Sequence, residues 1–193
     1  MNKLIKIGIF LLLFLYQLPA QDSTNVLIVY FSKTGNTKSM AKHVAQGAKK
    51  IENVHVKVVS VEKAKTSDLL KADAIILGSP VYNANVAPEM QSFINNWPFK
   101  GSPLKDKIGA AFVSGGGISA GEELTQLNLL HSMLVFGMVV VGGDSWRSAF
   151  GASAITSEEL FKAKNNDSEV DKMFLEKAES LGKRVAGLAR KMK

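Results

Sequence analysis

Apolar runs that alternate with helical patterns most restrict the fold of this chain. Three short stretches are almost wholly apolar, as in strands buried on both faces, and another alternates polar and apolar residues. With an apolar stretch near residue 140, they predict five strands, at 26–31, 55–61, 74–80, 108–114 and 138–142. Helical patterns follow each strand, at about 36–51, 66–71, 88–97, 121–135 and 168–192. This alternation predicts one α/β domain with a parallel sheet, right-handed crossovers and helices on both faces.

Composition excludes several classes of function. The 193 residues are 46% hydrophobic and 21% charged, as in a globular protein. There is no cysteine, which excludes disulfides, thiolate metal sites and cysteine nucleophiles, and no cluster of metal ligands is evident. The net charge of +7 is spread along the chain, without basic runs interleaved with aromatic residues. We therefore expect no metal site and no nucleic-acid partner.

The first twenty residues are typical of a secretory signal peptide. Lys3 and Lys6 precede an apolar run over 7–16, and Ala20 offers a small residue for cleavage. The run is short for a transmembrane helix, so we expect a signal peptide at 1–20 and a mature domain at 21–193, periplasmic or secreted, without a stable membrane span. The alternative is an uncleaved N-terminal anchor, because Leu18 and Pro19 depart from the usual cleavage pattern.

A polar loop follows the first strand. The loop and the start of the helix hold three hydroxyl side chains, a glycine and an amide, at Ser32, Thr34, Gly35, Asn36 and Thr37. The first N–H groups of a helix lack intrahelical partners, so such a loop can bind a phosphate. It is neither a Walker loop nor a dinucleotide-binding glycine turn. The alternative is an ordinary connection in which Asn or Thr caps the helix.

Polar loops also follow the third and fourth strands. The loop over 79–86 offers an aromatic plane in Tyr82 and two side-chain amides, whereas 114–117 is Ser-Gly-Gly-Gly with accessible backbone N–H groups. Parallel strands bring their carboxyl ends to one edge of the sheet. We therefore expect all three loops to surround a single crevice that accepts a phosphorylated, planar ring.

These motifs resemble a known family. The spacing Ser-x-Thr-Gly-Asn-Thr after an apolar strand resembles the phosphate loop of flavodoxins, which holds the phosphate of FMN. The stretches 77–85, 113–117, 136–140 and 150–153 are similar to the WrbA-type NAD(P)H:quinone oxidoreductase branch. The resemblance implies a flavodoxin-like doubly wound five-stranded parallel sheet of order 2-1-3-4-5. It also implies bound FMN, two-electron reduction of quinones by NAD(P)H, and a possible dimer or tetramer.

The same resemblance assigns site residues. Those expected to bind FMN lie in the three loops: Ser32, Thr34, Gly35, Asn36, Thr37, Pro80, Val81, Tyr82, Asn83, Asn85, Ser114, Gly115, Gly116 and Gly117. No catalytic group is identified, and the weak candidates are Tyr82, Phe136 and His131.

The sequence departs from the quinone reductases at two places. They carry a histidine pair where this chain has Val135 and Phe136, and His131 lies one helical turn earlier. They usually carry an arginine in the second loop, where this chain has Tyr-Asn-Ala-Asn. Export would also separate the domain from cytosolic NAD(P)H.

We therefore expect an exported FMN-binding oxidoreductase that uses NAD(P)H or a quinol to reduce quinone-like acceptors by two electrons. Its partner would be a small-molecule acceptor or a redox protein. The alternatives are a non-enzymatic flavodoxin-type electron carrier and a flavin-free binding domain on the same fold.

Overall fold

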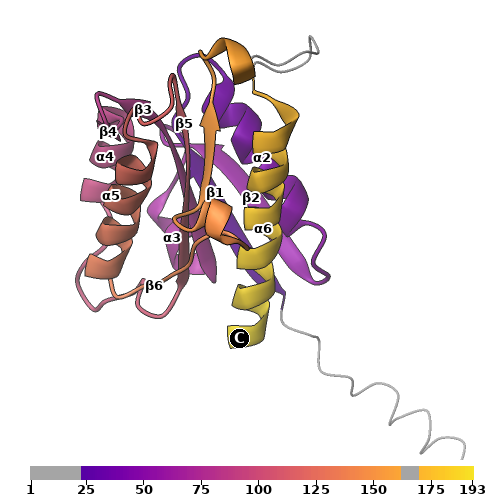
Figure 1. The fold of residues 1–193 in the computed structure, drawn as a ribbon. Helices are drawn as coiled ribbons and strands as arrows, with labels where there is room; N and C mark the ends of the chain where they lie inside the picture. Colours follow the sequence, from indigo (N-terminus) through magenta and orange to yellow (C-terminus); the bar gives the residue numbers. More distant parts are fainter. Residues whose placement is uncertain (1–22, 162–169) are drawn as a thin grey trace, which may run out of the picture.

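The computed structural model describes residues 23–161 and 170–193. The predicted signal peptide, and residues 168 and 169 of the last predicted helix, lie outside the described residues. A central sheet is covered by α2 and α6 on one face and by α3, α4 and α5 on the other (Figure 1). The elements are β1 (Thr24–Tyr30), α2 (Asn36–Ala48), β2 (Val54–Ser60), α3 (Thr66–Lys71), β3 (Ala74–Tyr82), β4 (Asn85–Val86), α4 (Pro88–Asn95), β5 (Ile108–Gly115), α5 (Glu122–Val135), β6 (Val139–Val140), the 3-10 helix η1 (Trp146–Ser148), β7 (Ala152–Ile155), η2 (Glu159–Phe161) and α6 (Lys172–Met192).

The flavodoxin-like α/β architecture is confirmed, but the sheet differs from the predicted one. It has seven strands rather than five, in the order β2-β1-β3-β5-β6, with β4 paired to β3 and β7 paired to β5. All pairs are parallel except β3 with β4. The predicted five-stranded sheet of order 2-1-3-4-5 is therefore corrected in two respects. The hairpin strand β4 is added, and the fifth position is shared by the two short strands β6 and β7.

The division of the fifth position has a local cause. β6 pairs only with Ile108 and Gly109, and β7 pairs with 112–115 further along the same strand. Between them the chain leaves the sheet and turns through η1. The segment 143–156 is rich in Gly, Ser and Ala, which have low strand propensity, so its sequence did not predict β7.

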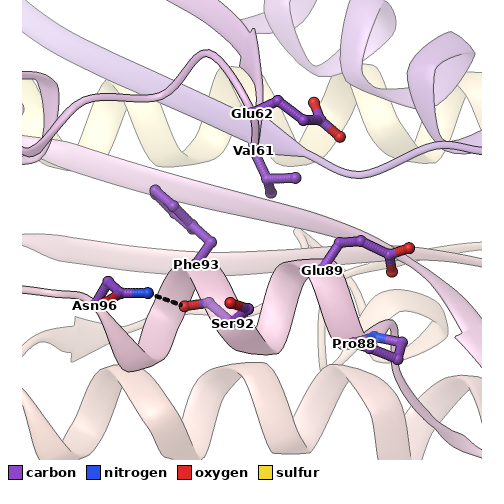
Figure 2. A pocket seen from close by; sticks show the side chains of 7 residues that line it. All are labelled: Val61, Glu62, Pro88, Glu89, Ser92, Phe93 and Asn96. Carbon is purple, nitrogen blue, oxygen red and sulfur yellow. Dashed lines mark hydrogen bonds between the residues drawn. The ribbon is translucent and has the colours of Figure 1, made fainter.

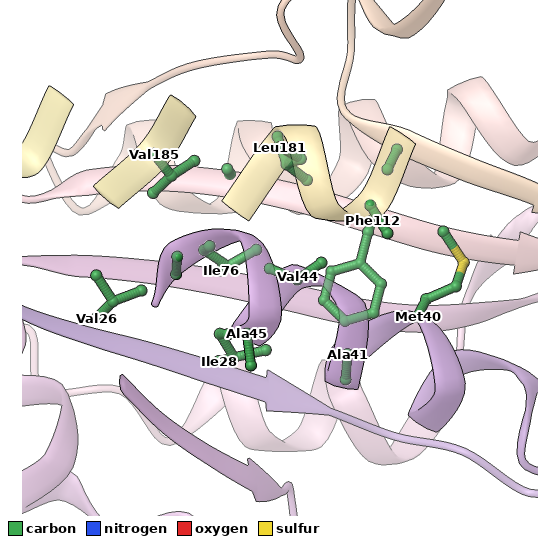
Figure 3. Packing of buried hydrophobic residues seen from close by; sticks show 14 of the residues in the cluster. Val26, Ile28, Met40, Ala41, Val44, Ala45, Ile76, Phe112, Leu181 and Val185 are labelled. Atoms are coloured by element: carbon green, nitrogen blue, oxygen red, sulfur yellow. The ribbon is translucent and has the colours of Figure 1, made fainter. Parts of the chain in front are cut away.

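Each face of the sheet has its own apolar core. Successive strand residues point to opposite faces, so Ile28 packs under α2 and α6 whereas Leu27 packs under the other helices. Figure 3 shows the first cluster, to which Val44 of α2, Leu181 of α6 and Phe112 of β5 all belong. Burial on both faces explains why β1, β3 and β5 are almost continuously apolar.

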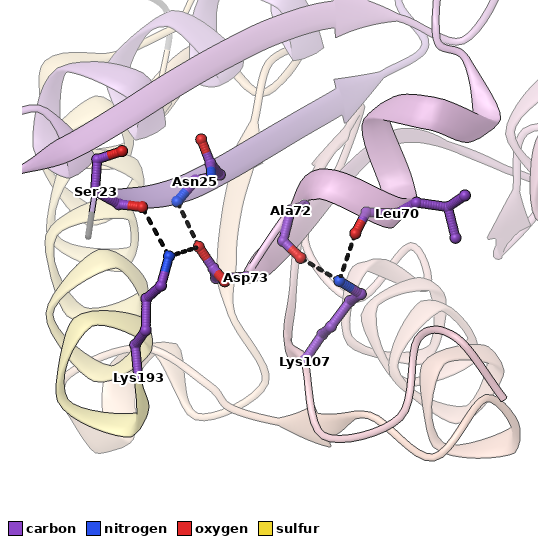
Figure 4. Close-up of polar contacts among 7 residues, drawn as sticks. All are labelled: Ser23, Asn25, Leu70, Ala72, Asp73, Lys107 and Lys193. Carbon is purple, nitrogen blue, oxygen red and sulfur yellow. Dashed lines mark hydrogen bonds and ion pairs between the residues drawn. The ribbon is translucent and has the colours of Figure 1, made fainter.

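Polar contacts stabilise the edge of the sheet at which the parallel strands begin. The ammonium group of Lys193, at the end of α6, donates to the carbonyl oxygen of Ser23 at 2.9 Å and pairs with Asp73 at 3.4 Å (Figure 4). The same carboxylate accepts a hydrogen bond from the N–H of Asn25, at 2.7 Å. The two ends of the described chain therefore meet at this edge.

None of the helices in the described ranges has the length and apolar character needed to cross a membrane.

Candidate functional site

The loop between β1 and α2 leaves a helix N-terminus open. α2 begins after Gly35, whose φ of 107° is costly for any residue with a Cβ, and this N-cap residue has no side chain that could cap the helix. The hydroxyl of Ser32 accepts hydrogen bonds from the N–H groups of Gly35 and Lys38, each at 3.2 Å, which holds the loop closed around the first turn. Neither Asn nor Thr caps the helix; the side-chain hydrogen bond to its first turn comes from Ser32 instead. The loop before the helix is exposed at residues 33–35, which suits an anion at the helix N-terminus.

A buried hydrogen bond ties this loop to the end of β5. The hydroxyl oxygens of Thr37 and Ser114 lie 2.8 Å apart, and the two side chains are 1% and 7% exposed. β5 is two positions from β1 in the sheet, so the bond spans the width of β3. The first and third predicted loops are thus in direct contact.

The second predicted loop is a β-hairpin. β3 continues to Tyr82, and Asn83 and Ala84 adopt left-handed conformations with φ of 49° and 61°, which turn the chain into β4. The buried hydroxyl of Ser79 accepts a hydrogen bond from the N–H of Ala87 at 3.0 Å and closes the base of the hairpin. Asn favours such a turn, whereas Ala84, which carries a Cβ, adopts its positive φ at a cost.

The hairpin contacts both other loops. The ring of Tyr82 stands edge-on to Phe31 of the first loop, with centroids 6.5 Å apart. At the hairpin tip, Ala84 packs against Gly121, the residue before α5, where an added Cβ would lie 2.4 Å from the Ala84 Cβ. The three segments that hold all the predicted FMN ligands therefore meet at one edge of the sheet.

Two carboxylates brace the third loop. The N–H of Ile118 donates to Glu158 at 3.4 Å, and the N–H of Ser119 donates to Glu122 at 3.1 Å. The other oxygen of Glu122 is buried and has no hydrogen-bond partner in the described part of the chain. The sequence analysis did not identify this role for either glutamate. Their negative charge disfavours a phosphate here, which leaves the α2 N-terminus as the anion end of the site.

Two of the weak catalytic candidates do not join these loops. α5 runs from the carboxyl edge to the opposite edge, where the carbonyl of Gly137 accepts a hydrogen bond from Asp106, just before β5. Phe136 lies at that far end and packs on Trp97, with ring centroids 5.2 Å apart. His131 is exposed on α5. Of the three candidates, only Tyr82 lies at the site.

A groove of about 570 Å³ lies between the turn after β2 and α4. Figure 2 shows Val61 and Phe93 facing each other across it, with Glu62 and Glu89 near the same end. The full lining is Val61, Glu62, Pro88, Glu89, Ser92, Phe93 and Asn96, none of which belongs to the three loops.

Burial, together with the negative charge of Glu62, raises the pKa of the Tyr30 phenol at the end of β1. Within 23–161 and 170–193, no three His, Asp or Glu side chains are grouped to hold a metal.

Comparisons with known proteins agree with this architecture. The family model described as "Flavodoxin domain" matches residues 27–150. A protein named "Flavodoxin" from Clostridium saccharobutylicum is 34% identical over 118 residues, covering 61% of this chain and 72% of that protein. A protein named "NAD(P)H dehydrogenase (quinone)" from Archaeoglobus fulgidus is 31% identical over 196 residues, covering 86% and 98%.

Solved structures are similar over most of the chain. The flavodoxin-type, WrbA-like protein from Agrobacterium tumefaciens superposes with a TM-score of 0.71 at 25% identity, over 89% of this chain and all of that one. The two-electron reduced flavodoxin of Megasphaera elsdenii gives a TM-score of 0.61 at 24% identity, over 84% and 98%.

Proposed function

Because the chain belongs to the flavodoxin family, we propose that it binds FMN non-covalently at the carboxyl edge of its sheet and acts as an exported oxidoreductase. Flavodoxins bind FMN where β1 and β3 diverge in the sheet order. The observation that carries the proposal is the contact between Thr37 and Ser114, which holds the N-terminus of α2 beside the end of β5.

Each loop has a distinct part in binding. The first turn of α2 and the hydroxyl of Thr34 would hold the phosphate, since the N–H dipoles and the exposed loop favour a dianion there. Tyr82 would cover one face of the ring, with Phe31 supporting it from the side. Bound FMN would supply hydride or single-electron transfer, and the protein would set its orientation and exclude water.

For the reaction, we propose two-electron reduction of quinone-like acceptors, with NAD(P)H or a quinol as the donor. The support is the 31% identity to the Archaeoglobus fulgidus protein, which extends over nearly all of that protein. Steady-state assays with the flavin-loaded protein, a soluble quinone and NADPH or a quinol test this directly. Turnover with either donor supports a reductase.

An electron carrier without turnover is the second candidate. It is favoured by the position of His131 and Phe136, which leaves Tyr82 as the only one of the three catalytic candidates at the loops. Full FMN occupancy without turnover, together with rapid electron exchange with a redox protein, would establish the carrier.

The first experiment is a visible spectrum of the purified protein, followed by removal of any flavin and titration with FMN. We expect one FMN per chain. Absence of colour and of FMN uptake would reject both redox functions and favour a flavin-free binding domain.

We also propose that the protein is exported through the segment 1–20. Fractionation of expressing cells and N-terminal sequencing test this. A periplasmic or secreted protein beginning at Gln21 would support cleavage, and a membrane-bound protein beginning at Met1 would indicate the anchor. A cytoplasmic protein would reject export.

A further inference from the structure

Basic side chains gather at the edge of the sheet where the parallel strands begin. The ends of α2, α3 and α6 and the loop over 96–107 form this edge, and the end of α6 is marked C in Figure 1. Six of these side chains have no hydrogen-bond or ion-pair partner within residues 23–161 and 170–193. We call the six the basic edge: Lys49, Lys71, Lys100, Lys105, Arg190 and Lys191.

Three further lysines at this edge have a local structural role. Lys107 donates to two carbonyl oxygens at the end of α3, and Lys193 pairs with Asp73 (Figure 4). Lys50 pairs with Glu179 of α6. Cations are favourable at the C-terminal ends of helices, which accounts for a lysine such as Lys107. The basic edge makes no such contacts, so its charge remains available to a partner.

Acidic side chains offset only part of this charge. The connections that form the edge hold three of them, Glu52, Asp73 and Asp106. Asp73 is already engaged by Lys193 and by the N–H of Asn25. Glu52 and Asp106 are exposed, and they oppose the six free cations of the basic edge. The surface as a whole therefore stays positive and suits an anionic partner.

Exposed apolar side chains lie among these cations. Phe99, in the loop after α4, is 67% exposed and packs edge-on against Phe136, with ring centroids 5.7 Å apart. Met192, at the end of α6, is 55% exposed. A hollow of about 150 Å³, which Lys105 and Met192 help to line, joins the loop after α4 to the end of α6. Lysines beside exposed apolar side chains are typical of surfaces that bind at the headgroup level of a membrane.

The N-terminal segment joins the domain at the same edge. Ser23 lies beside Lys193 (Figure 4), and the apolar run over 7–16 precedes it in the sequence. Fully extended, the chain from residue 16 to residue 23 spans at most about 25 Å. Under the export proposed above, a membrane that holds the apolar run would therefore lie close to the basic edge. This favours a lipid surface over a nucleic acid or an acidic protein as the anionic partner.

We propose that the basic edge docks peripherally on a membrane surface of anionic phospholipids, with Phe99 and Met192 entering the headgroup region. Each cation held near such a surface strengthens binding about fivefold, so several together give a measurable affinity. The docking surface belongs to the folded domain and does not require residues 1–20 to be retained. The three loops of the candidate site lie at the opposite edge, so they would face away from the lipid, toward a soluble acceptor or redox protein.

Co-sedimentation with lipid vesicles tests the proposal, using the protein purified as the host processes it. Vesicles of phosphatidylcholine containing phosphatidylglycerol are compared with vesicles of phosphatidylcholine alone, so that binding through a retained apolar run, which both would show, cancels. We expect stronger binding to the anionic vesicles, and this preference should fall as salt is added. No preference for the anionic vesicles at low salt overturns the proposal.

A matched pair of double variants locates the docking surface. Lys100→Gln with Lys105→Gln should weaken binding to the anionic vesicles about tenfold. Lys63→Gln with Lys65→Gln removes two exposed lysines from the turn between β2 and α3, at the opposite edge, and should leave binding unchanged. Equal loss of binding in the two double variants overturns the assignment to the basic edge.

Site-directed labelling tests the orientation. The chain has no cysteine, so one introduced cysteine can carry an environment-sensitive dye. Ser102→Cys places the dye in the exposed loop after α4, and Ala120→Cys places it in the exposed loop before α5. We expect anionic vesicles to shift the emission of the dye at residue 102 and not at residue 120. A shift at residue 120 as large as that at residue 102 overturns the orientation.

Two further measurements separate lipid docking from the other possibilities. Phe99→Ser should weaken binding to anionic vesicles severalfold, since its ring would enter the headgroup region. Binding to a DNA duplex without binding to vesicles would assign the surface to nucleic acids and overturn the proposal. FMN titration of the Lys100→Gln, Lys105→Gln variant distinguishes this inference from the proposed function, because loss of vesicle binding with flavin uptake retained concerns the basic edge alone.

Discussion

Thr37 and Ser114 share a buried hydrogen bond of 2.8 Å that joins the first turn of α2 to the end of β5. The two residues are 77 positions apart in the sequence, so the bond reports on the assembled sheet rather than on either loop alone. We propose that Thr37 lies next to the phosphate of FMN. The bond holds Thr37 in place through the hydroxyl of Ser114, which lies at the end of β5.

We expect Thr37→Val to lower the free energy of unfolding by about 1–2 kcal/mol, because it leaves the buried hydroxyl of Ser114 without its partner. Ser114→Ala should cost a similar amount. The double variant should cost clearly less than the sum of the two, since the remaining groups are both apolar. Urea denaturation of the four proteins measures this. Strict additivity would contradict a direct contact.

Gly35 offers a test of the phosphate end of the site. Gly35→Asp should weaken FMN binding about a hundredfold, because it adds a negative charge within a few Å of the proposed dianion. Gly35→Ala is the control: no atom lies within 4 Å of the added Cβ, so only strain from the positive φ is expected, about 1 kcal/mol. FMN titration and thermal denaturation of both variants separate charge from strain. Equal loss of affinity in both would place the phosphate elsewhere.

Gly121→Ala should destabilise the fold by about 2–3 kcal/mol, through overpacking and a positive φ of 98°. The added Cβ would lie 2.5 Å from the Cα of Ala84 as well as 2.4 Å from its Cβ, so Ala84→Gly should not restore stability. Gly101→Ala, with a φ of 79° in open space, is the matched control and should cost only about 1 kcal/mol. Chemical denaturation compares them; equal costs would argue against the tight contact.

Asp68 provides a test of pH dependence. Its carboxylate accepts a hydrogen bond from Lys57 at 2.7 Å, which lowers its pKa below the usual range, and it also binds the N–H of Lys65. A carboxyl with a lowered pKa stabilises the fold above its unfolded value of about 3.9 and loses that effect as pH falls through the lower folded value. Asp68→Asn should therefore cost about 1 kcal/mol at pH 7, and the difference should close in strong acid.

The control for this prediction is Glu176→Gln, which removes an exposed pair with Lys172 at 3.6 Å and should change stability by less than about 0.5 kcal/mol. A stability difference for Asp68→Asn that stays constant from pH 7 into strong acid would contradict the role of the ionised carboxylate.

Periodicity alone predicted the buried strands, because a strand covered on both faces has to be apolar throughout. The runs at 26–31, 74–80 and 108–114 correspond to β1, β3 and β5 with shifts of no more than two residues at either end. β7 was not predicted, since its Ala and Ser residues form a strand only because the edge of β5 is available to pair with. β4 likewise depends on the turn at Asn83 and Ala84.

The site was predicted in part for the same reason. The topology of a parallel sheet places the three loops at one edge, so the sequence could indicate where they meet. The bracing of the third loop could not be predicted, because Glu158 reaches Ile118 across 40 residues.

Lys193 and Ser23 are joined by a hydrogen bond at the edge of the sheet opposite to the loops. A short linker between these positions would close the backbone into a ring with little strain, and new ends could then be cut in the exposed turn at 100–102. For the same reason, protein immobilised on an electrode through residue 193 would present its proposed redox edge to the solution, where an acceptor can reach it.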